Sequence, residues 1–119
     1  MIPTITRGDA TIDVDTLPAC PVETTLTLIS DKWKILIVRD LLTGTKRFSE
    51  LRRSIGHISQ KALTSNLRQM EADGLVHREV YPEVPPRVEY SLTDTGHSLK
   101  TVIDALWNWG EDYKAKLAA

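Results

Sequence analysis

The chain has 119 residues, of which 41% are hydrophobic, and its formal net charge is −1 at pH 7. This length supports one domain with a hydrophobic core and is too short for two domains of ordinary size. No run approaches the ~20 apolar residues of a membrane span, and the N-terminal segment lacks the basic flank and apolar stretch of a signal peptide. We therefore expect a cytoplasmic protein, and its single cysteine, Cys20, fits a reducing compartment.

The first elements of the chain are an arm and two helices. Residues 1–19 show no sustained helical period, which predicts an extended arm ahead of a domain over residues 20–119. Pro21 suits a first helical turn, and the apolar spacing after it predicts a short helix over residues 20–29. Asp31 is an N-cap candidate for a second helix, which ends near Gly44 and has too many apolar positions for one stripe. We expect this second helix at the centre of the core.

A short helix, a glycine-bearing break and a second helix follow, which is the pattern of a helix-turn-helix. Residues 46–48 form a brief strand or a link, and Ser49 is predicted to cap the short helix. Ser59 is predicted to cap the next helix, which should end at Asp73 and Gly74. In that helix the apolar residues share one stripe at positions i, i+4 and i+7, namely Leu63, Leu67 and Met70.

The outer face of this helix carries hydrogen-bond donors and cations without any acid between Ser59 and Gln69. Such side chains match DNA base edges and phosphates. Residues 45–70 contain six bases and one acid, a balance of +5, whereas residues 1–31 contain one base and five acids. The alternative is an ordinary solvated face, but such faces normally alternate the sign of charge. We therefore favour DNA binding.

The remaining chain predicts a β-hairpin and a final helix. HREVY and RVEYSL alternate at period two around a proline-rich segment, which indicates two antiparallel strands joined by a stiff loop. Thr93 should cap a long last helix that begins at about Asp94. The whole is a winged helix-turn-helix, mainly α with a small β wing. Arg87 would be the wing cation, unless it is an ordinary arginine at a strand end in solvent.

Five motifs occur in the order KW with an aliphatic run, RFSELRR, ISQKALT, LRQMEADGL and YPEVPPRVEYSLT. Over roughly Cys20 to Gly110 the chain closely resembles the HxlR-type family of bacterial winged-helix transcription regulators. The resemblance implies a homodimer, joined largely through the N-terminal region and the last helix. It also implies a pseudo-palindromic double-stranded DNA operator and control of transcription nearby, for which we expect repression.

Roles can then be assigned to residues. Ser59 and Gln60 lie where a helix N-terminus can meet phosphate, and Arg68 either reads a guanine or clamps a phosphate. Arginines outside this helix should mostly hold phosphates. The predicted DNA-binding residues are Arg47, Ser49, Arg52, Arg53, Ser59, Gln60, Lys61, Thr64, Ser65, Arg68 and Arg87.

The last helix carries more aromatic surface than so short a chain readily covers, and aromatic residues are enriched in interface cores. The alternative is that these side chains close the core of the monomer. HTH proteins generally read two half-sites with two-fold symmetry, which favours an interface. The predicted dimerisation residues are Leu106, Trp107, Trp109 and Tyr113.

Cys20 stands at a predicted helix N-terminus, where the helix dipole favours the thiolate. In several members of the resembled family a cysteine at this place senses oxidants or electrophiles, whereas the structural alternative is a small buried hydrophobe. A lone cysteine limits the chemistry to a bridge between subunits, a mixed disulfide with a small thiol, or alkylation.

Other functions have less support in the sequence. A thiol enzyme could combine Cys20 with His57, His77 or His97, but the spacing suits no ligand set and there is no nucleophile motif. We expect no enzyme, metal or cofactor. A winged helix released by a small-molecule ligand at the dimer interface, or one used only for protein contacts, stays open as an alternative.

Overall fold

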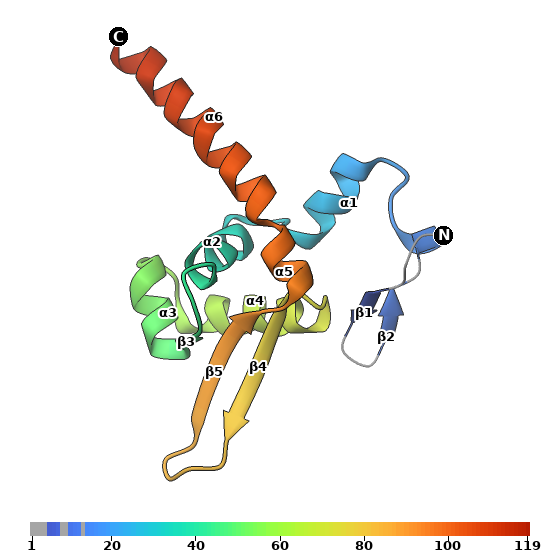
Figure 1. The fold of residues 1–119 in the computed structure, drawn as a ribbon, viewed down its shortest axis with the longest axis vertical. Helices are drawn as coiled ribbons and strands as arrows, with labels where there is room; N and C mark the ends of the chain where they lie inside the picture. Colours follow the sequence, from blue (N-terminus) through green and yellow to red (C-terminus); the bar gives the residue numbers. More distant parts are fainter. Residues whose placement is uncertain (1–4, 8–9, 13) are drawn as a thin grey trace.

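A computed structural model describes residues 5–7, 10–12 and 14–119. At its centre, helices α2 (Lys32–Leu41), α3 (Phe48–Ile55) and α4 (Gln60–Ala72) pack with a small sheet (Figure 1). The sheet has the antiparallel order β3-β5-β4, formed by β3 (Lys46–Arg47), β5 (Arg87–Leu92) and β4 (Val76–Tyr81). This arrangement confirms the predicted winged helix-turn-helix.

Capping side chains explain where the central helices begin. Asp31 Oδ1 accepts hydrogen bonds from the backbone N–H groups of Trp33 at 2.9 Å and Lys34 at 3.1 Å. Ser59 Oγ likewise accepts from the backbone of Ala62 at 3.0 Å, as predicted. Gly74 follows α4 at φ +77°, a left-handed conformation that glycine adopts without steric cost.

The prediction that Ser49 caps α3 is wrong. The helix begins at Phe48, two residues earlier than predicted, with Arg47 at the N-cap position. Glu50 reaches back, and its Oε1 accepts a hydrogen bond from the backbone N–H of Arg47 at 2.8 Å. Because this carboxylate satisfies a free N–H at the helix start, the serine is left inside the first turn.

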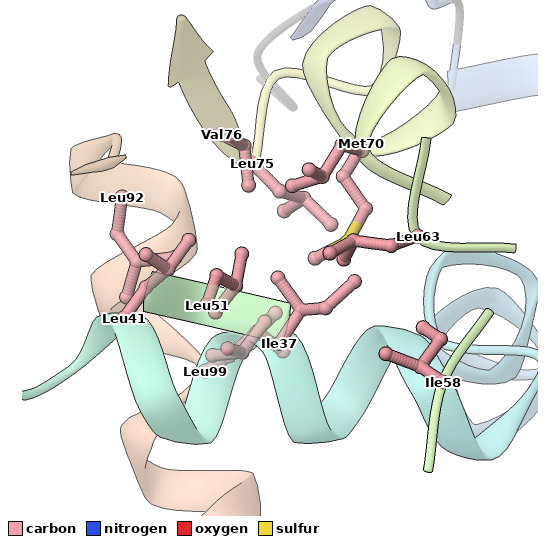
Figure 2. Packing of buried hydrophobic residues seen from close by; sticks show 12 residues of the cluster. Ile37, Leu41, Leu51, Ile58, Leu63, Met70, Leu75, Val76, Leu92 and Leu99 are labelled. Atoms are coloured by element: carbon pink, nitrogen blue, oxygen red, sulfur yellow. The ribbon is translucent and has the colours of Figure 1, made fainter. Parts of the chain in front are cut away.

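The core lies between the three central helices and the base of the wing (Figure 2). The predicted stripe of α4 is buried, with Leu63, Leu67 and Met70 each at most 2% exposed. Ile37 of α2 and Leu51 of α3 are completely buried against it. Each such side chain contributes roughly 1.5–3 kcal/mol through burial, which fixes the orientation of α4.

The N-terminal segment precedes α1 (Pro21–Leu28). Strands β1 (Ile5–Arg7) and β2 (Ala10–Ile12) pair antiparallel, and a 3-10 turn, η1 (Val14–Thr16), follows. The sequence predicted extended chain here but not that the strands pair with each other. Strand β1 contacts α4. The rest of the predicted arm (residues 1–4, 8–9 and 13) lies outside the described residues, and the division of the chain at residue 19 stays a prediction.

The predicted last helix is divided into α5 (Asp94–Ser98) and α6 (Lys100–Ala118). Thr93 caps the first piece as predicted, since its Oγ1 accepts from the backbone of Gly96 at 3.0 Å. Leu99 is buried at the junction, and α6 then projects away from the core (Figure 1). No helix among the described residues combines the length and apolar character that a membrane crossing requires.

Candidate nucleic-acid interface

The outer face of α4 gathers the side chains predicted to read DNA. Gln60, Lys61, Ser65 and Arg68 are exposed and Thr64 is half-buried. Within the described part of the chain, neither Lys61 nor Arg68 is paired with a carboxylate, so both cations are available to an anionic partner. The buried stripe on the opposite face holds this helix in place.

These side chains line one continuous depression. A hollow of about 650 Å³ is lined by the five predicted residues of α4 together with Gln69. A second hollow, of about 610 Å³, is lined by Phe48, Ser49, Arg52, Arg53, Gly56 and Gln60. Gln60 borders both, so α3 and the start of α4 share one donor-rich surface that suits the phosphates and base edges of a duplex.

Arg52 also supports the turn between the two helices. Its Nε donates a hydrogen bond to the backbone oxygen of Ile58 at 3.3 Å. Ile58 is itself buried, so this bond ties the guanidinium to a fixed part of the backbone. Arg53 is exposed next to Arg52, so both arginines are well placed for phosphate contacts beside α4.

Arg87, predicted as the wing cation, is bonded to two carboxylates in the structure. Its Nε donates to Glu83 Oε2 at 2.6 Å and its Nη1 to Glu89 Oε2 at 2.9 Å. Its guanidinium also lies over the ring of Tyr81, 3.9 Å from the centroid. The hydrogen bond to Glu83 raises the pKa of Arg87 above its usual value. The charge of Arg87 is therefore compensated within the wing.

Sequence reasoning missed Arg78 and Tyr90, which line a third hollow of about 290 Å³ between the wing and α4. Arg78 is exposed and stands two residues after the buried Val76. The period-two alternation of this strand was the signal that could have found it, because residues i and i+2 share a face.

Cys20 and the apolar residues of α6 lie on other parts of the molecule. The cysteine is exposed at the N-cap position of α1, so the alternative of a buried hydrophobe is wrong. The alternative in which the α6 aromatics close the monomer core is wrong too. Trp109 is 68% exposed and stacks on Tyr113 with 5.2 Å between the ring centroids. Leu106 and Trp107 are exposed as well.

Comparison with known proteins identifies the family. The model of the HxlR-like helix-turn-helix family matches residues 28–118. The uncharacterized HTH-type transcriptional regulator YdeP of Bacillus subtilis is 50% identical over 103 residues, which cover 87% of this chain and 80% of YdeP.

Solved structures of transcriptional regulators have the same fold as this chain. The redox regulator HypR in its oxidized form superposes with a TM-score of 0.73 at 50% identity, over 78% of this chain and 96% of HypR. The transcriptional regulator YodB of B. subtilis, in its reduced form, superposes with a TM-score of 0.70 at 36% identity, over 81% of this chain and 95% of YodB. The chain belongs to the HxlR-like helix-turn-helix family and is a DNA-binding transcriptional regulator, not an enzyme.

Proposed function

We propose that the protein binds a pseudo-palindromic operator as a homodimer in the cytoplasm and represses the genes beside it. The observation that carries this proposal is the outer face of α4 between Gln60 and Arg68, which has no acid and presents donors and cations around one hollow, none of the cations paired with a carboxylate among the described residues. Eight of the predicted DNA-binding residues line this hollow or the neighbouring one, namely Ser49, Arg52, Arg53, Gln60, Lys61, Thr64, Ser65 and Arg68, whereas Arg47, Ser59 and Arg87 line neither. Repression follows from occupancy, because a dimer bound over a promoter excludes the polymerase.

Homodimerisation is supported by large apolar side chains that are exposed on the described part of the monomer. On α6, Leu106, Trp109 and Tyr113 are spaced to share one face, and each is about half exposed or more. On α1, Val22 and Leu26 are exposed as well. Large exposed apolar groups in a soluble chain mark an interaction surface. A second copy would cover them and place two α4 helices about one DNA turn (~34 Å) apart.

We propose in addition that Cys20 controls release of the operator. Its exposure allows an oxidant or electrophile to reach the thiol, and its place at the N-cap of α1 puts it beside the positive end of the helix dipole. One similar protein is named the redox regulator HypR, and another, the transcriptional regulator YodB, has been solved both in its reduced form and after diamide treatment. Oxidation would join the two Cys20 thiols of a dimer or cap each with a small thiol.

DNA binding by α4 is tested by titrating a labelled duplex, long enough for two half-sites, with the wild-type protein and the Arg68→Gln variant at several salt concentrations. The wild type should bind with an affinity that falls linearly with salt on a logarithmic plot. Arg68→Gln should either relax base preference, at a cost of about 1–3 kcal/mol, or lower the salt slope by about one.

The matched control is Lys114→Gln, which removes the same charge from an exposed position of α6. It should leave the binding curves unchanged. A wild-type affinity that does not respond to salt, or equal effects of the two substitutions, would contradict the proposal.

A further inference from the structure

The wing contains two arginines in different electrostatic settings. Arg87 is bonded to Glu83 and Glu89, as described above. If its guanidinium moved to a DNA phosphate, both carboxylates would be left uncompensated close to a polyanion. That arrangement costs binding energy twice, because two favourable ion pairs are broken and two repulsive charges are exposed.

The strand register shows which wing side chains share a face. Arg78 of β4 is paired with Tyr90 of β5, and Tyr90 is paired with Lys46 of β3. Directly paired residues of antiparallel strands point to the same side of the sheet. One face of the wing therefore carries the row Lys46, Tyr90 and Arg78. The neighbouring row, which points to the other face, is formed by Arg47, Glu89 and Glu79.

The first of these faces is the one that meets α4. Arg78 and Tyr90 line the 290 Å³ hollow together with four residues of the helix, Thr64, Leu67, Arg68 and Glu71. Two of those, Thr64 and Arg68, also line the 650 Å³ hollow on the outer face of α4. The depression that we assign to DNA thus continues from α4 onto the Arg78 side of the wing, and not onto the Arg87 side.

We propose that Arg78 is the cation with which the wing holds a DNA phosphate, and that Arg87 serves to neutralise Glu83 and Glu89. Within the described residues Arg78 forms no ion pair, and its exposed side chain can reach a ligand. Glu71 is the one acid that lines the same hollow. The phosphate bound by Arg78 lies next to the base pairs read from α4, so Arg78 positions the duplex and reads no sequence. This assignment rests on the proposed function of α4.

The test is the salt slope of duplex binding for three variants of the full chain. Arg78→Gln should weaken binding equally for all sequences and lower the slope by about one. Arg78→Lys should keep the wild-type slope, because a lysine can still hold a phosphate as a point charge. Arg78 is exposed, so the thermal melting temperature should stay the same and confirm that the variants are folded.

The third variant is charge-neutral and tests Arg87. Arg87→Gln combined with Glu83→Gln removes one positive and one negative charge that are already paired. It should bind duplex DNA with the wild-type slope. A wild-type slope for Arg78→Gln, or a slope lowered by about one for the double variant, would overturn the assignment.

Failure of this assignment can be told apart from failure of the proposed function. If α4 does not bind DNA, Arg68→Gln will behave like Lys114→Gln and no wing variant will matter. If α4 binds DNA but the wing is assigned wrongly, Arg68→Gln will still alter binding while Arg78→Gln will not.

Discussion

Asp40 shows how one side chain fixes the geometry of the helix-turn-helix. Its carboxylate is almost completely buried and accepts hydrogen bonds from Arg39 Nε at 2.7 Å and Ser54 Oγ at 2.8 Å. The pair with Asp40 raises the pKa of Arg39. Because Ser54 belongs to α3 and Asp40 to α2, this bond sets α3 against the core. Nothing in the sequence spacing predicts it, since the two residues lie 14 positions apart.

Oxidation of a single residue, Cys20, is predicted to release the protein from DNA. Diamide should release duplex DNA from the wild type, because oxidation of the exposed thiol alters the start of α1. Cys20→Ser should keep its DNA under the same treatment, since a serine hydroxyl is almost isosteric and is not oxidised. Gel-shift titration of both proteins, before and after diamide, measures the effect. Unchanged binding in the wild type, or equal release from both proteins, would remove Cys20 from the mechanism.

Among single side chains, the sequence predicts those whose position follows from helical spacing. The outer residues of α4 follow from the buried stripe, because a helix that buries Leu63 and Leu67 must expose Lys61 and Arg68. The partners of Arg87 could not be predicted in this way. The carboxylates of its partners, Glu83 and Glu89, are brought to it by the path of the proline-rich loop and by the register of the strands. The loop path and the register are properties of the folded chain, which local spacing does not reveal.

At the level of elements, the junction between α4, the wing and α5 is tightly packed. Thr93 N donates to the backbone oxygen of Leu75 at 3.1 Å, and Thr93 Oγ1 donates to that of Gly74 at 2.6 Å. Gly96 lies against this same turn, where a Cβ atom would collide with the backbone oxygen of Leu75. The closeness of α5 to the turn therefore depends on a residue without a side chain.

Gly96→Ala should lower the free energy of unfolding by about 1–3 kcal/mol, because the backbone of Leu75 has to move to accommodate the methyl group. Gly110→Ala is the matched control, since its Cβ would meet no atom of the described residues within 4 Å and alanine favours a helix by ~1 kcal/mol. Urea unfolding of both variants gives the two values. Equal stabilities for the two variants would show that the junction is looser than described.

Most elements could be predicted from local signals, because caps and periodicity are local. The start of α4 follows from Ser59, and its end follows from Gly74. What the sequence left open or missed depends on distant contacts. It left open whether residues 46–48 form a strand or a link, and β3 forms because β5 offers it a free edge. The division between α5 and α6, which was missed, follows from burial of Leu99 in the core. The sequence pattern alone predicted a single continuous helix there.

In the whole molecule, the surface that we propose binds DNA lies on α4, whereas the exposed apolar residues of the proposed dimer interface lie on α6. The α4 surface and the wing lie on one part of the fold, while α6 projects from another (Figure 1). This separation lets a dimer form through α6 without covering α4. The net charge of −1 is compatible with DNA binding, because the positive charge of the chain is concentrated in residues 45–70.

The central claim is that two copies of α4 read one symmetric operator. It is tested most directly by sequencing the duplexes that the purified protein retains from a random pool. Trp109→Asp, which places a charge on the exposed apolar face of α6, is carried in parallel with Asn108→Asp, which places the same charge about 100° around that helix, off the face shared by Leu106, Trp109 and Tyr113.

The wild type and Asn108→Asp should both enrich two inverted copies of one short sequence, about one helical turn apart. Trp109→Asp should lose this paired enrichment, because a monomer offers a single α4. Absence of any enriched sequence, or enrichment of one unpaired site by the wild type, would contradict the account.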